Sequence, residues 1–289
     1  VFDTTLIERS AWFDGAADNL TKSFGSGADQ QEFVLAAWVK RSSFGSLQFF
    51  FGSGDLYKIF SFGFNASDQL ELQDYDAPIN ARYITNARFR DTGWYHVLTS
   101  IKTSESVAND RVKIFVNGSE ITSFSTETDP SLNFDMNWGI SGDTHAIGSY
   151  FASYGLSFFK GYITQAVYIS GKSIQGGDFT ISDFLDTYTF GANGSQYVPR
   201  ADATIAALAT AAGGNAFCLT TAIGDGTDAS GNGNNFTPNS MSDAANGSAN
   251  TPSLVYPVLN ILYPANTAPT SEGGQTVACT AGKGYFTSQ

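Results

Sequence analysis

The chain is poor in the residues that build disulfide frameworks, metal sites and basic surfaces. Its 289 residues include only two cysteines, Cys218 and Cys279, and two histidines. Two cysteines cannot form a disulfide framework, and neither has the neighbouring Cys or His ligands of a zinc site, so we predict two buried thiols. The formal net charge of −12 repels a phosphate backbone or an anionic membrane surface, which argues against nucleic acid as a partner.

Long apolar runs are missing as well. No segment has the apolar length of a membrane-spanning helix, so we expect no membrane insertion, and the start at Val1 shows no signal segment. Helix is poorly supported, because 30 glycines and 14% aromatic residues favour short strands joined by many turns. The composition predicts an all-β fold, and 42% hydrophobic residues suffice for one large domain or two smaller ones.

One stretch predicts a hairpin with a defined register. Val112–Val116 alternates as a strand does, with one set of side chains on each face. The dipeptide Asn117-Gly118 follows, and both residues tolerate the positive φ that a type I′ turn requires. The pairing that results places Ile114 opposite Ile121.

The composition of the sequence changes after residue 190. From Ser10 to about Phe190, apolar runs recur between turn signals, a spacing typical of a β-sandwich. From 191 to 289 the chain is rich in Gly, Asn, Ser and Pro, and we predict an extended arm that needs a partner surface to pack on. Within it, the Ala-rich run Asp202–Ala212 is the one plausible helix.

Several segments resemble, in order, the strands of a laminin-G-like, concanavalin-A-type jelly roll. They are Trp12–Asn19, Phe33–Lys40, Gly93–Val97, Arg111–Gly118 and Ala146–Tyr150. Phe159–Ser173 and Asp228–Phe236 resemble, more narrowly, laminin-G-bearing virion proteins of tailed and especially marine bacteriophages. The resemblance covers residues 8 to 240 and implies a jelly-roll sandwich of two antiparallel sheets at 1–190. The resemblance also implies that the arm leads toward a second β domain, which we expect to be absent from this sequence or only partly contained in it.

The resemblance implies a structural protein of the virion rather than an enzyme. It would be a tail fibre or a decoration protein of head or tail, made in the host cytoplasm without a signal peptide, and its partners would be other virion proteins and host-surface polysaccharide. A fibre would be a homo-oligomer, typically a trimer. Two alternatives stay open: a polysaccharide depolymerase on the same scaffold, with Glu71 and Asp76 as its carboxylates, and a purely structural cement protein without glycan affinity.

Candidate glycan-binding residues lie in the Gly- and Asn-rich segment Asn137–Gly155. Trp138, Tyr150 and Tyr154 lie there, and sugar faces stack on such rings when a loop presents them. Core packing is the competing fate of these aromatics.

Candidates for catalysis are few. Glu71–Asp76 holds three carboxylates, but Glu71 and Asp74 are three residues apart and point to opposite faces of a regular strand, whereas jelly-roll glucanases place their acids two apart. A solvated strand end is the preferred interpretation. His96 and His145 lack carboxylate or His partners nearby, and His96 is expected to be a hydrogen-bonded imidazole of the core.

Two segments raise the question of calcium, although we expect no cofactor. Asp228–Asn234 has oxygen side chains at the first, third and fifth positions and Gly at the sixth, as a calcium loop does. The twelfth position is Asn239 instead of a bidentate Glu, so a tight polar turn is preferred. Asp14 and Asp18, in a short turn, are a second calcium candidate with the same alternative.

Overall fold

The computed structural model describes residues 7–54, 58–150, 157–189, 195–252, 271–272, 275–280 and 283–287. The chain divides into two compact units, Asp3–Pro252 and Ser253–Gln289. Each unit is described by itself.

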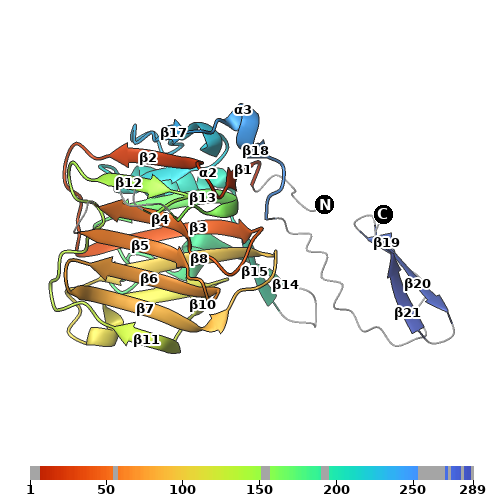
Figure 1. Ribbon diagram of the computed structural model, residues 1–289, viewed down its shortest axis with the longest axis horizontal. Coiled ribbons are helices and arrows are strands. Elements are labelled where there is room, and N and C mark those ends of the chain that lie inside the picture. Colours follow the sequence, from red (N-terminus) through yellow and green to blue (C-terminus); the bar gives the residue numbers. More distant parts are fainter. Residues whose placement is uncertain are drawn as a thin grey trace. The chain divides into compact units, whose positions relative to one another are not determined.

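The first unit is a sandwich of two eight-stranded antiparallel sheets (Figure 1). Sheet A has the order β10 (Ser119–Glu120), β9 (Val112–Val116), β8 (Trp94–Lys102), β3 (Glu32–Arg41), β13 (Lys160–Ser170), β1 (Ser10–Asp14) and β18 (Gly247–Ser248), with β16 (Phe217–Leu219) also paired to β13. Sheet B has the order β11 (Phe124–Thr128), β7 (Ile79–Arg88), β6 (Gln69–Tyr75), β5 (Ile59–Phe64), β4 (Gln48–Gly54), β12 (Thr144–Ile147), β2 (Asn19–Ser23) and β17 (Thr237–Asn239). The predicted all-β jelly-roll class is confirmed.

Helices are short and lie outside the two sheets. Among the described residues the longest is α2 (Asp202–Ala212), which confirms the predicted helix. The other helices of the described residues are α1 (Ile181–Phe184), α3 (Asp243–Asn246) and the 3₁₀ turns η1 (Ala108–Asp110) and η3 (Ile223–Asp225). A small hairpin of β14 (Leu185–Thr189) and β15 (Ser195–Pro199) precedes α2.

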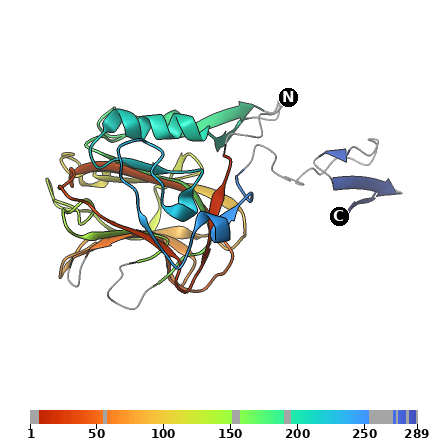
Figure 2. The same ribbon diagram turned by 90° about the horizontal axis from the view of Figure 1, so that it is seen from above.

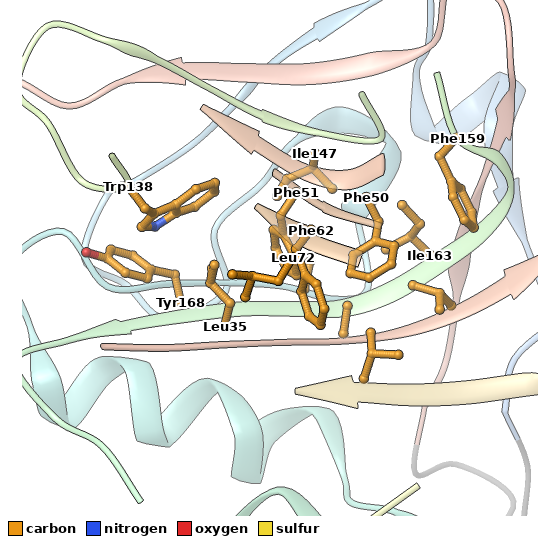
Figure 3. Close-up of a cluster of buried hydrophobic side chains, with 14 of the residues drawn as sticks. Leu35, Phe50, Phe51, Phe62, Leu72, Trp138, Ile147, Phe159, Ile163 and Tyr168 are labelled. Atoms are coloured by element: carbon orange, nitrogen blue, oxygen red, sulfur yellow. The ribbon is translucent and has the colours of Figure 1, made fainter. Parts of the chain in front are cut away.

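Sheet A is covered on both faces because its strands carry apolar side chains at successive positions. On β3, Phe33, Leu35 and Val39 belong to the main core between the sheets, whereas Val34 and Trp38 belong to a second apolar cluster on the outer face. Figure 3 shows Leu35 in the main core. Helix α2 lies over this outer face (Figure 2). Covering the outer face removes further apolar area from water, which stabilises the sandwich by about 25 cal/mol per Å².

The predicted hairpin has the expected register. Asn117 and Gly118 have φ values of 48° and 79°, as a type I′ turn requires. Ser119 pairs with Val116, and the backbone N–H of Ile121 donates to the carbonyl of Ile114 over 2.8 Å. The local sequence therefore determines this register.

The sandwich includes more of the chain than the predicted 1–190. The first unit extends to Pro252, and β16, β17 and β18 add strands to both sheets. Polar side chains hold this Gly- and Asn-rich region in place through backbone groups: the amide of Asn246 donates to the carbonyl of Trp12, and that of Asn234 donates to the carbonyls of Gly214 and Ala216. The composition predicts a loose arm, but this region packs along the edge of the sandwich. Hydrogen bonds hold it there in place of apolar burial.

The second unit contains a three-stranded antiparallel sheet of β19 (Ser271–Glu272), β20 (Gln275–Thr280) and β21 (Lys283–Thr287). Cys279 lies in β20, but its side chain is outside the described residues, so its predicted burial stays a prediction. Cys218, in β16, is a buried free thiol as predicted. Among the described residues, no helix has the length and hydropathy of a membrane span.

Candidate functional site

The structure contradicts the assignment of Trp138 to a sugar-binding surface. Its side chain is 0% exposed and lies between the sheets (Figure 3). Its ring packs against His145 at 4.9 Å, Phe60 at 5.6 Å and Tyr168 at 5.7 Å between centroids. Trp138 is therefore a core residue, because the loop that carries it folds inward over the end of the main core.

The glycan-binding roles predicted for Tyr150 and Tyr154 differ in what the structure says of them. Tyr150 is partly exposed, and its ring lies 5.1 Å from that of Phe49. Burial, together with the charge of Glu71, raises the pKa of the Tyr150 hydroxyl. Tyr154 lies outside the described residues, so its proposed role stays a prediction.

The three carboxylates of Glu71–Asp76 do not form a catalytic pair. Glu71 is 5% exposed on the outer face of sheet B and accepts two hydrogen bonds from Arg82, at 3.0 and 2.9 Å. Asp74 is fully buried and accepts from the backbone and the amide of Asn137 at 2.7 and 2.8 Å. Asp76 forms an ion pair with Lys58 at 3.7 Å. Each acid has its own partner, and Glu71 and Asp74 lie on opposite faces, as the spacing predicts.

The buried carboxyl of Asp74 predicts a measurable pH dependence of stability. Burial raises its pKa to about 7, against the opposing effect of hydrogen bonds from Asn137 and Asn80. Between about pH 4 and pH 7 the native state therefore holds a proton that the unfolded state has lost, so stability falls as the pH rises through this window. We expect Asp74→Asn to remove this slope, roughly 2–4 kcal/mol in total, in urea titrations at pH 4, 5.5 and 8. Parallel stability profiles for the two proteins would contradict the assignment.

Both histidines are buried in the fold. Burial lowers the pKa of His96 to about 3 and that of His145 to about 4, so both rings are neutral at pH 7. His145 accepts from the backbone N–H of Gly139 at 2.9 Å. His96 lies in the apolar layer as predicted, but its Nδ1 has no hydrogen-bond partner among the described residues, contrary to the expected bonded imidazole.

The two segments considered for calcium are closed polar turns. Asp228 accepts from the backbone N–H groups of Cys218, Ser230 and Asn234 at 2.9 to 3.0 Å. Asp14 likewise accepts from three backbone N–H groups of its own turn, those of residues 16, 17 and 18. Their carboxylates hold the chain, and no cluster of three or more His, Cys, Asp or Glu side chains suited to a metal ion occurs in the described parts.

Four side chains from four neighbouring strands form one row on the outer face of sheet A. Trp12 of β1 pairs with Tyr162 of β13. On the other side of β13, Tyr162 pairs with Lys40 of β3, which pairs with Trp94 of β8. Ring centroids are 4.8 Å apart for Trp12 and Tyr162 and 6.3 Å apart for Tyr162 and Trp94. We call these four residues the aromatic row.

The aromatic row lies where the apolar covering of sheet A ends. On β3, Trp38 is 1% exposed beneath that covering, and Lys40, next on the same face, is partly exposed. Trp12, Tyr162 and Trp94 are also partly exposed. Exposed rings in contact, with a charged group among them, can stack on the apolar face of a ligand while the charge binds its polar groups.

The family described as the concanavalin A-like lectin/glucanases superfamily matches residues 14–166, just over half of the 289 residues. The chain belongs to this superfamily. Among curated proteins, no relative matches it.

Solved structures with the fold of this superfamily match the sandwich at low identity. A pentraxin from Limulus polyphemus is 16% identical, with 65% of this chain and 84% of the pentraxin covered and a TM-score of 0.45. A putative carbohydrate binding protein from Bacteroides ovatus is 18% identical, with 58% and 45% covered and a TM-score of 0.43. Domains LG4-5 of the mouse laminin alpha1 chain are 11% identical, with 66% and 46% covered and a TM-score of 0.41. These likenesses concern the fold alone.

The aromatic row was not predicted from the sequence. Trp12 and Trp94 were assigned to predicted strands, without a connection to Tyr162 or Lys40. The four residues are far apart in the sequence, and only strand pairing brings them together. A signal was present nonetheless, because aromatic residues at strand ends beside polar ones are typical of partly exposed positions.

Proposed function

We propose that the chain is a non-enzymatic carbohydrate-binding protein and that the aromatic row is its contact surface. The observation that carries this proposal is the contact between three partly exposed rings in one line across sheet A. Membership of a superfamily named for lectins and glucanases supports a sugar ligand. The separate pairing of each of the three carboxylates of Glu71–Asp76 supports binding without hydrolysis.

The tilt of the rings favours a single sugar chain over a flat crystalline surface. Trp12 and Tyr162 are inclined to each other by 58°, and Tyr162 and Trp94 by 50°. A flat array of chains requires coplanar rings, whereas a flexible oligosaccharide turns each unit to stack on one ring. Strands lie about 4.8 Å apart, so the row across four strands has roughly the length of a short oligosaccharide.

The same proposal places the protein on a phage particle. Its sequence resemblance to laminin-G-bearing virion proteins supports a role as a fibre or a decoration protein, oligomeric if it is a fibre. Gold-labelled antibody against the chain should decorate purified particles of the encoding phage in electron micrographs. Particles that stay unlabelled while the protein accumulates in the lysate would contradict this placement and leave sugar binding to be judged separately.

We expect Trp12→Ala to weaken sugar binding roughly two- to tenfold, because stacking on a partly exposed ring is worth about 0.5–1.5 kcal/mol and Trp12 ends the row. The measurement is binding to a glycan array, followed by titration calorimetry with the best ligand. Tyr150→Ala is the matched control, since it removes a partly exposed ring that packs on Phe49 in sheet B.

The control also decides between the two surfaces. If Tyr150→Ala abolishes binding and Trp12→Ala leaves it intact, the site lies on sheet B beside Glu71. If the array shows no binding at all, the cement-protein alternative is favoured. Release of reducing ends from a bound polysaccharide would show a depolymerase instead.

A further inference from the structure

We propose that the aromatic row selects sugars that carry a carboxylate, such as uronic or sialic acids, and that Lys40 is the selecting residue. This inference rests on the proposed function, since it concerns the ligand of the same surface. It follows from the charge and the hydrogen-bonding groups that surround the three rings.

Lys40 carries the one charge of the row. Its strand neighbours on this face are Tyr162 and Trp94, and its ammonium lies 6.0 Å from the centroid of the Tyr162 ring. The ammonium donates to the side-chain oxygen of Asn250 over 3.2 Å. Asn250 is itself fixed, because its carbonyl accepts from the hydroxyl of Ser10 and its N–H donates to the hydroxyl of Ser248. The lysine head is therefore held beside the rings.

The charge of Lys40 is not neutralised by the protein. No carboxylate of the described residues lies within 4.0 Å of its ammonium, and its one hydrogen-bond acceptor is a neutral amide. Two other lysines of sheet A are paired: Lys102 with Glu32 at 2.9 Å, and Lys113 with Asp110 and Glu120 at 2.8 and 3.1 Å. Lys40, by contrast, is a cation without a carboxylate partner that lies beside the partly exposed rings.

The groups that surround the rings are mainly hydrogen-bond donors. An ammonium has three donor hydrogens and no acceptor. The side-chain oxygen of Asn250 is occupied by Lys40, which leaves its amide hydrogens for a ligand. A ligand that supplies acceptors and negative charge fits this set, and a carboxylate on a sugar provides both, with a charge-assisted bond about twice as strong as a neutral one.

The net charge of −12 limits how many anionic groups the ligand carries. At physiological ionic strength, charges beyond about 8 Å are largely screened, so the lysine determines the local interaction with one carboxylate. A polyanion that extends over the rest of the surface meets repulsion instead. We therefore expect a glycan with an isolated or terminal acidic sugar rather than a densely sulfated one.

The test compares matched acidic and neutral sugars by titration calorimetry on the full chain. The pairs are trigalacturonate and galactotriose, glucuronic acid-terminated cellobiose and cellotriose, and sialyllactose and lactose. We expect the wild-type protein to bind the acidic member of at least one pair at least fivefold more tightly. Lys40→Met should equalise the two affinities, Lys40→Arg should keep the preference, and raising the salt concentration should reduce it.

Lys160→Met is the control, because Lys160 is an exposed lysine on β13, the strand that carries Tyr162. It should leave the preference unchanged. If neutral sugars bind as tightly as their acidic partners, or if Lys40→Met keeps the preference, the inference is wrong while sugar binding stands. If no sugar of either kind binds and Trp12→Ala changes nothing, the proposed function fails with it.

Discussion

Replacing Asp68 by alanine is expected to lower the free energy of unfolding by about 3–5 kcal/mol, because it leaves a buried guanidinium without its counter-charge. The side chains of Arg41 and Asp68 are 1% and 4% exposed, and the two groups are 3.0 Å apart. Arg41 points into the sandwich from β3, over the ring of Phe64 at 4.6 Å, and also donates to the carbonyl of Phe89. The pair therefore joins sheet A to a turn and a strand end of sheet B.

Two variants make this expectation specific. Arg90 bonds the other oxygen of Asp68 at 2.9 Å, but its side chain is 56% exposed, so Arg90→Met should cost about 0–1 kcal/mol. The double variant Arg41→Met with Asp68→Leu should recover most of the loss, because an apolar pair needs no counter-charge. Urea denaturation measures all three. A double variant as unstable as Asp68→Ala would show that the loss comes from the turn and not from the unpaired charge.

The stabilisation by Asp68 depends on pH and is lost in acid. Burial alone would raise the pKa of Asp68, but hydrogen bonds from Gly45, Arg90 and Arg41 outweigh it and hold the pKa below its ordinary value. Because the pKa of this carboxyl is lower in the native state, the carboxylate stabilises that state at pH values above its unfolded-state pKa. This stabilisation is lost as the pH falls through the native-state pKa. The advantage of the wild-type protein over Asp68→Ala should therefore shrink below about pH 4.

Local sequence signals predicted much of the fold. The Asn117-Gly118 turn fixed its hairpin because positive φ restricts the residues that fit it. Helix α2 was predictable from an Ala-rich run that ends at two glycines. In both cases the decisive interactions lie within a few residues of each other.

The aromatic row depends on information that is not local. On β13, regular alternation would place Tyr162 and Tyr168 on the same face, yet Tyr168 belongs to the main core and Tyr162 faces outward. The strand changes phase at a bulge between Thr164 and Val167, where Gln165 has a φ of 46°. The amide of Gln165 there bonds Asp202 at the start of α2. A sequence with no Gly or Pro at this point gives little sign of a bulge.

The incorrect placement of Trp138 has a related cause. Composition correctly describes its segment as Gly- and Asn-rich, but one buried carboxylate determines its path. Asp74 binds the backbone and the amide of Asn137, the preceding residue, and the hydroxyl of Ser53 donates to the carbonyl of Asn137. These bonds hold the loop against the end of the core, so the next side chain enters it.

Trp138→Ala is consequently expected to destabilise the protein by about 3–5 kcal/mol, the usual cost of removing a buried aromatic and leaving a cavity. The ring contacts Phe51, Phe60, His145 and Tyr168, which come from three strands of sheet B and one of sheet A. Trp138→Phe is the control, and we expect a smaller loss because it keeps part of the ring contacts. Thermal and urea unfolding measure both.

The effect on sugar binding separates a core residue from a contact residue. A core role predicts that Trp138→Ala, at a temperature where it is still folded, binds sugar as the wild-type protein does, while Trp12→Ala binds weakly at unchanged stability. Trp138→Ala thus changes stability and Trp12→Ala changes sugar binding, because Trp138 lies between the sheets and Trp12 lies on the outer face of sheet A. A folded Trp138→Ala protein with full stability and no sugar binding would reverse this assignment and return the site to the loop.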